Sequence, residues 1–74
     1  MIEVAREIER VLSLNPGEVT EQSALLDIEN MDSLTFEMLL LRLEDLSGRE
    51  IGPDVFLNWR SVADIQSWID RASP

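Results

Sequence analysis

The sequence contains no cysteine, no histidine, no lysine and no tyrosine among its 74 residues. Without cysteine or histidine, neither a Cys–His nor a Ser–His nucleophilic pair can form, and a zinc site would have carboxylate ligands only. We therefore expect a protein that is not an enzyme and that binds no metal ion. The missing cysteines also leave the redox compartment undetermined, because no disulfide could report on it.

Positive charge is scarce as well, because the chain carries 6 basic residues, all arginine, against 15 acidic ones, for a net charge of −9. Such a surface repels nucleic acid and anionic membranes, so we expect neither as a partner. It suits protein partners with basic patches, because complementary charge speeds their encounter. The alternative is an acidic surface that only keeps the protein soluble.

Long apolar runs are also absent, and no segment is long enough to cross a bilayer. The first residues, Met1-Ile2-Glu3-Val4, lack the basic region and apolar core of a signal peptide. We expect a soluble, cytoplasmic and monomeric protein with one domain over residues 1–74. A chain of this size buries only about 60% of the surface that it exposes when unfolded, too little to enclose a substrate.

The first part of the chain predicts one amphipathic helix and a long connection. Apolar residues recur at helical spacing over residues 2–14, and Asn15-Pro16-Gly17 ends the pattern. Residues 15–32 show no sustained periodicity, so we expect a loop with one helical turn. The apolar residues expected to hold this loop on the core are Ala24, Leu25, Leu26 and Ile28.

The second helix is expected to run from Asp32 or Ser33 to Leu46 and to end at Ser47-Gly48. Either Asp32 or Ser33 supplies the side-chain oxygen that caps the first amides. At about 100° per residue, one side of this helix belongs to the core. That side holds Phe36, Leu39, Leu43 and Leu46.

The opposite side of the second helix is unusual for an amphipathic helix, because it carries three large apolar residues. It holds Ser33, Leu34, Glu37, Met38, Leu41, Glu44 and Asp45. We interpret it as an exposed binding face. The alternative is a different rotation, in which Leu40 and Leu41 face a further core element.

The rest of the chain predicts a short helical turn over residues 54–58 and a last helix from Ser61, whose S-x-x-D spacing with Asp64 is typical of a capping box. The buried stripe of that helix is expected to be Val62, Ile65, Trp68 and Ile69. No segment alternates long enough to predict a strand. The fold class is therefore all-α, a small antiparallel bundle of three main helices plus one short helix, with a long loop between the first two.

This arrangement, with Asp32-Ser33-Leu34 opening the second helix, resembles the acyl carrier protein family over essentially the whole chain. The resemblance implies a free-standing carrier on which a phosphopantetheinyl transferase attaches 4'-phosphopantetheine covalently to the Ser33 hydroxyl, with Asp32 assisting recognition. Acyl groups would then ride on the terminal thiol, which this cysteine-free chain cannot supply itself. An exposed helix start suits the site, because its free amides favour a negative phosphodiester.

The resemblance also assigns a role to the exposed face of the second helix. Leu34, Met38 and Leu41 would form an apolar patch, which acyltransferases, ligases or synthases would contact through basic docking surfaces. The acidic rim of this patch would consist of Glu37, Glu44 and Asp45.

The sequence departs from the carriers of fatty-acid synthesis, which usually show D-L-G-x-D-S-L. Asn30 stands where glycine is usual, and asparagine is the residue that best replaces glycine at positive φ. Thr35, Glu37 and Met38 also differ from the usual continuation, which favours polyketide, antibiotic or aminoacyl pathways over fatty-acid biosynthesis. The Gly-Gly-His or Gly-Gly-Asp pattern of peptidyl carriers is absent.

A second function class remains compatible with these patterns. An unmodified acidic interaction module would use the same helix face for binding and Ser33 only as a helix cap.

Overall fold

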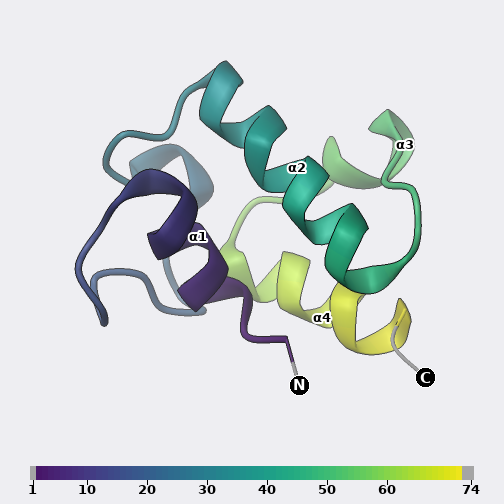
Figure 1. The fold of residues 1–74 in the computed structure, drawn as a ribbon, viewed down its shortest axis with the longest axis horizontal. Coiled ribbons are helices and arrows are strands. Elements are labelled where there is room, and N and C mark those ends of the chain that lie inside the picture. The colour runs from purple at the N-terminus through teal and green to yellow at the C-terminus, as the bar shows by residue number, and fades with distance from the viewer. Residues whose placement is uncertain (1, 73–74) are drawn as a thin grey trace.

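The computed structural model describes residues 2–72, which form four α-helices and one 3-10 turn (Figure 1). Within these residues there is no strand, only an isolated bridge between Ala24 and Ser61. The predicted all-α bundle with a long first loop is confirmed. Its elements are α1 (Val4–Leu12), η1 (Leu25–Asp27), α2 (Ser33–Ser47), α3 (Pro53–Phe56) and α4 (Val62–Ala72).

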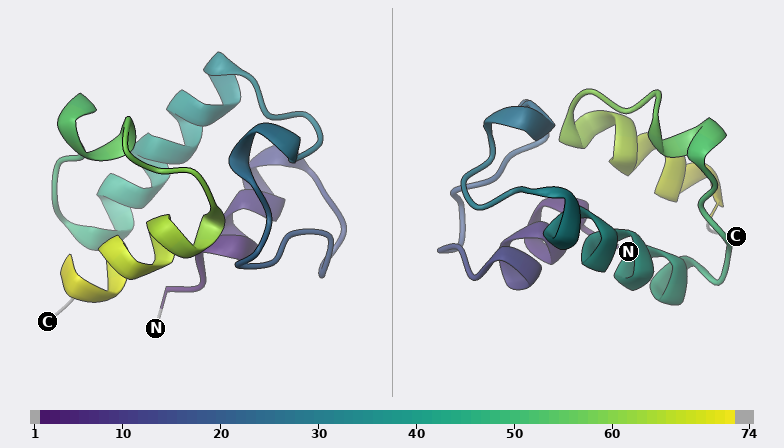
Figure 2. Two further views of the ribbon diagram at one scale, coloured as in Figure 1. Left: turned by 180° about the vertical axis from the view of Figure 1, so that it is seen from behind. Right: turned by 90° about the horizontal axis from the view of Figure 1, so that it is seen from above.

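The core lies between α1, α2 and α4, which contact one another, while α3 covers one side (Figures 1 and 2). The rings of Phe36 and Phe56 meet edge to face at 5.7 Å and join α3 to α2. Within residues 2–72 no helix combines the length and apolar character that a membrane span requires. The largest fully buried side chains are Ile8, Leu39, Leu43, Ile65, Ile69, Val4, Val19 and Val62.

Three residues expected in the core are not there. Leu46, in the last turn of α2, is 37% exposed. Ala24 is exposed, since its backbone pairs with Ser61 and its side chain points outward. Leu26 is 98% exposed, because the η1 turn buries Leu25 and turns the next residue away from the core.

The observed ends of the helices differ by one or two residues from those that the apolar pattern predicted, and local conformation explains the difference. α1 ends at Leu12 because Ser13 adopts the left-handed conformation, with φ of 58°. α3 begins one residue early, with Pro53 at its first positions, where its missing N–H costs nothing. At the start of α4, Asp64 Oδ2 accepts from the Ser61 N–H at 3.0 Å, the carboxylate half of the predicted capping box.

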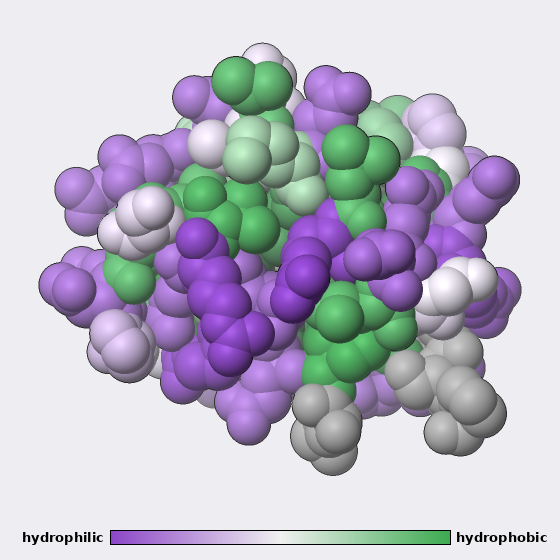
Figure 3. Space-filling view, in the orientation of Figure 1, coloured by the Kyte–Doolittle hydropathy of each residue, from purple (hydrophilic) through white to green (hydrophobic). Residues whose placement is uncertain are grey.

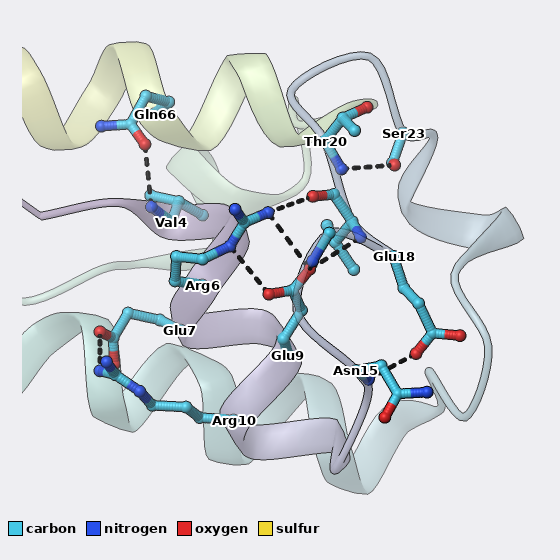
Figure 4. Close-up of polar contacts among 12 residues, drawn as sticks. Val4, Arg6, Glu7, Glu9, Arg10, Asn15, Glu18, Thr20, Ser23 and Gln66 are labelled. Atoms are coloured by element: carbon cyan, nitrogen blue, oxygen red, sulfur yellow. Dashed lines mark hydrogen bonds and ion pairs between the residues drawn. The ribbon is translucent and has the colours of Figure 1, made fainter.

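Two buried carboxylates on α1 were not predicted, and the first of them fastens the long loop (Figure 4). Glu9 Oε2 accepts from the N–H groups of Gly17 and Val19, each at 2.9 Å. Arg6 Nε lies 2.8 Å from Glu9 Oε1. The N–H of Val19, then that of Gly17 and the charge of Arg6, lower the pKa of Glu9 below its ordinary value of 4.5, although burial opposes them.

The second buried carboxylate joins α1 to α2. Glu7 Oε1 accepts from Arg42 Nε at 3.0 Å, and Glu7 Oε2 lies 2.7 Å from Arg10 Nη1. The contact with Arg42 holds α2 against α1.

Glu9→Gln is expected to lower the melting temperature at pH 7 by roughly 10 °C, because the neutral amide loses the ion pair with Arg6 and turns an N–H donor toward the guanidinium, while its oxygen still accepts from Gly17 and Val19. Since folding lowers the pKa of Glu9, its stabilisation is present above the ordinary pKa and is lost as pH falls through the folded pKa. Thermal unfolding at pH 7, 5, 4 and 3 should therefore show the two proteins converging in acid. Glu37→Gln, at an exposed position on α2, is the control and should stay near wild type at pH 7. An equal gap at every pH would contradict this role of Glu9.

Candidate functional site

The start of α2 is closed by a reciprocal capping box. Asp32 Oδ1 accepts from the Thr35 N–H at 2.8 Å, and Thr35 Oγ1 accepts from the Asp32 N–H at 2.8 Å. The sequence left the cap open between two residues, and the structure assigns it to Asp32. Ser33 is therefore the first helical residue, and it is exposed.

The turn before α2 is held by the backbone conformation of Asn30 and by a hydrogen bond from Thr35. Asn30 has φ of 68°, as expected for asparagine at a position where glycine is usual. Thr35 Oγ1 lies 3.1 Å from the Asn30 carbonyl oxygen, to which it can donate its proton. The same hydroxyl thus connects the turn, the cap and the first helical turn around Ser33.

The charge at the site is also set by this box. The N–H and hydroxyl of Thr35, followed by the Leu34 N–H, hold the pKa of Asp32 below its ordinary value of 3.8. Asp32 is therefore an anion at neutral pH. The amides at the N-terminus of α2 supply partial positive charge, which favours a phosphate group on Ser33.

The exposed face of α2 continues from Ser33 along the helix. Leu34 is 66% exposed, Met38 47% and Leu41 60%. Figure 3 shows apolar surface over the upper part of α2 in the same orientation as Figure 1. The predicted rotation of α2, with Leu34, Met38 and Leu41 facing away from the core, is confirmed. In the alternative, both Leu40 and Leu41 would face the core, but only Leu40 packs against it.

The sequence model of a protein family described as "Phosphopantetheine attachment site" matches residues 3–69. The chain belongs to this family. Domains of this family hold a covalently attached phosphopantetheine, on which other groups are carried. This domain is therefore a carrier and not an enzyme, as predicted. Bound phosphopantetheine supplies a thiol on a flexible arm, and the exposed Ser33 hydroxyl at a helix N-terminus fits its attachment.

Relatives of the domain are acyl carrier proteins by name. It is 28% identical over 68 residues to "Meromycolate extension acyl carrier protein" of Mycobacterium leprae (strain TN), covering 92% of this chain and 59% of the relative. The protein of the same name from Mycolicibacterium smegmatis is 29% identical over 68 residues, which are 92% of this chain and 69% of that relative. "Acyl carrier protein 2" of Ralstonia nicotianae is 30% identical over 53 residues, which are 72% of this chain and 65% of the relative. The chain thus spans about three fifths of the length of the M. leprae relative.

The acidic residues of the domain's α2 face divide into two groups. Glu37 and Asp45 are exposed. Glu44 is half-buried, and its Oε2 accepts from the Ile51 N–H at 2.7 Å. Glu44 therefore helps to hold the loop after α2, which leaves Glu37 and Asp45 as the freely exposed acids of the expected rim.

Thr35 is the site residue that the sequence reasoning missed, because it was noted only as a departure from the family pattern. The signal that could have revealed Thr35 is the spacing of a capping box. In this pattern the cap residue, here Asp32, is followed three residues later by a side chain that can accept from the N–H of the cap residue.

Thr35→Val is expected to lower the melting temperature of the domain by roughly 5 °C, because it removes the acceptor for the Asp32 N–H while keeping the side-chain shape. Thr35→Ser retains the hydroxyl and is the matched control, expected to stay within about 2 °C of wild type. Thermal unfolding followed by circular dichroism measures both. Equal melting of the valine and serine variants would show that the hydroxyl does not support the cap.

Proposed function

We propose that Ser33 carries the phosphopantetheine arm and that the domain transports acyl intermediates as thioesters on this arm from one biosynthetic enzyme to the next. The observation that carries the proposal is the exposed Ser33 at the first position of α2, with Asp32 rather than Ser33 serving as the cap. It is joined by the family match over residues 3–69. The absence of cysteine supports it further, because the thiol must then come with the prosthetic group.

The chain's own part in this function is to hold the arm and present it. The amides at the start of α2 would stabilise the negative phosphodiester, and the box formed by Asp32 and Thr35 fixes the first turn in which Ser33 lies. A flexible arm on a rigid helix raises the effective concentration of cargo at a partner's active site by tethering.

For the pathway, we propose polyketide or other natural-product biosynthesis, with acyl rather than aminoacyl cargo. The support is the departure of Thr35, Glu37 and Met38 from the usual fatty-acid pattern, together with the missing glycines of peptidyl carriers. The name of the mycobacterial relatives refers to meromycolate extension, which favours lipid-chain extension as the second candidate.

The test is the intact mass of the protein after incubation with coenzyme A and a broad-specificity phosphopantetheinyl transferase. We expect a gain of one phosphopantetheine, which fragmentation should locate on Ser33. No gain in mass would favour the unmodified interaction module. The mass of protein isolated from its native host would report the acyl group and separate the two pathways.

We further propose that the exposed α2 face docks on basic surfaces of the transferase and of acyltransferases, ligases or synthases. Reversing Glu37 and Asp45 to lysine should slow association roughly 3- to 10-fold at low salt and flatten its salt dependence, because exposed charges steer encounters until screened. Stopped-flow association rates against the transferase at several salt concentrations measure the effect. The matched control reverses Glu3 and Glu21, which are exposed and lie outside α2. Equal effects from both pairs would mean that only net charge matters.

A further inference from the structure

Leu26, in the η1 turn, is the most exposed large apolar side chain among residues 2–72, at 98%. Single exposed leucines are ordinary on protein surfaces, so exposure alone assigns no role. Three further properties of this leucine indicate that it has a role in binding.

The first property is that the turn is held rigidly. The residues on either side of Leu26 in the loop are anchored, since Leu25 and Ile28 are 7% and 8% exposed. The Leu25 N–H donates to the Arg60 carbonyl oxygen at 3.0 Å, and the Val62 N–H donates to the Ser23 carbonyl oxygen at 3.0 Å. A side chain on a fixed backbone loses less entropy when a partner covers it.

The second property is position. Figures 1 and 2 place η1 toward the end of the bundle where α2 begins, and the view from above in Figure 2 shows it beside the start of α4, in the layer opposite α2. Only six residues separate Leu26 from Ser33, and the turn between them is fixed by the positive φ of Asn30.

The third property is the charge around the leucine. Asp27 and Glu29 are exposed, so the loop repeats the pattern of the α2 face, an apolar residue beside acids. A partner surface with a basic rim and an apolar centre is complementary to both segments.

We propose that Leu26 is a second apolar anchor for the phosphopantetheinyl transferase, a proposal that rests on the proposed attachment at Ser33. The transferase must bring its reacting groups to Ser33 Oγ itself, so its footprint is centred there. A typical footprint of about 800 Å² per partner is about one sixth of the 4837 Å² surface of this protein. An area of this size centred on Ser33 is large enough to include the η1 turn as well as the α2 face. Enzymes that act on the cargo meet it at the far end of the arm and need not cover this turn.

The test is the steady-state rate of modification, followed by intact mass, with a broad-specificity transferase. Leu26→Ala should lower kcat/KM about 5- to 20-fold through KM, with kcat unchanged, because an anchor contributes binding and leaves the Ser33 turn intact. Leu26→Arg should lower it further than Leu26→Glu, since the arginine would face a basic surface. Leu46→Ala is the matched control, because Leu46 lies 13 residues along α2 from Ser33, about 20 Å of helix, and should leave kcat/KM unchanged.

Wild-type kinetics for Leu26→Ala would overturn the anchor while leaving attachment at Ser33 in place, since the wild type would still gain mass. A loss in kcat instead of KM would also overturn it, because the leucine would then act on the geometry of the turn. If the wild type gains no phosphopantetheine at all, the proposed function fails and the anchor fails with it. Melting temperatures of all variants, expected to match wild type for Leu26→Ala, confirm that folded proteins are compared.

Discussion

Replacing Ser33 with alanine is expected to abolish loading of the domain completely while leaving its helices in place. The phosphodiester has no attachment atom once the hydroxyl is gone. The cap of α2 is unaffected, because Asp32 and Thr35 form it without the serine side chain. Alanine is also a good helix former, so the free energy of unfolding should change by no more than about 0.5 kcal/mol.

Intact mass after incubation with coenzyme A and transferase, together with a thermal melt, measures both halves of this prediction. Ser67→Ala, at an exposed position on α4, is the control and should load like wild type. If Ser33→Ala still gains a phosphopantetheine, the arm is attached to another serine, and the alternatives are Ser13, Ser23, Ser47, Ser61, Ser67 and Ser73.

The α2 helix could be predicted from the sequence almost in full, for physical reasons. Its cap and its terminating Gly48 are local signals, since the first depends on a side chain next to the amides and the second on a left-handed φ of 71°. Its 15 residues make four turns, enough for the 100° periodicity to define which side is buried. The exposed positions of Leu34 and Leu41 followed from that periodicity.

The features that could not be predicted depend on contacts between distant segments. A loop has no periodicity, so nothing local distinguishes buried Leu25 from exposed Leu26. The burial of Glu9 requires amides from a loop eight and ten residues further along the chain. The partial exposure of Leu46 depends on how other segments pack at the end of α2, which the apolar pattern of α2 does not contain.

Leu43→Ala and Leu41→Ala are expected to have opposite consequences, although the two residues are of one type and lie two positions apart on α2. Leu43 is fully buried, so its truncation should cost about 2–5 kcal/mol through lost packing and a cavity. A chain of 74 residues has a total stability of roughly 4–11 kcal/mol, so this variant should be close to unfolding at 37 °C. Urea unfolding at 25 °C measures the difference.

Leu41→Ala removes a side chain that is 60% exposed, so it should change stability by no more than about 0.5 kcal/mol. Its effect should fall on binding, because affinity differences within one interface are expressed mainly in dissociation rates. We expect the complex with the transferase to dissociate several-fold faster while association and its salt dependence stay unchanged, which is the reverse of the result for Glu37 and Asp45. A larger loss of stability in Leu41→Ala than in Leu43→Ala would mean that the rotation of α2 is wrong, and the docking face would have to be sought on another side of the helix.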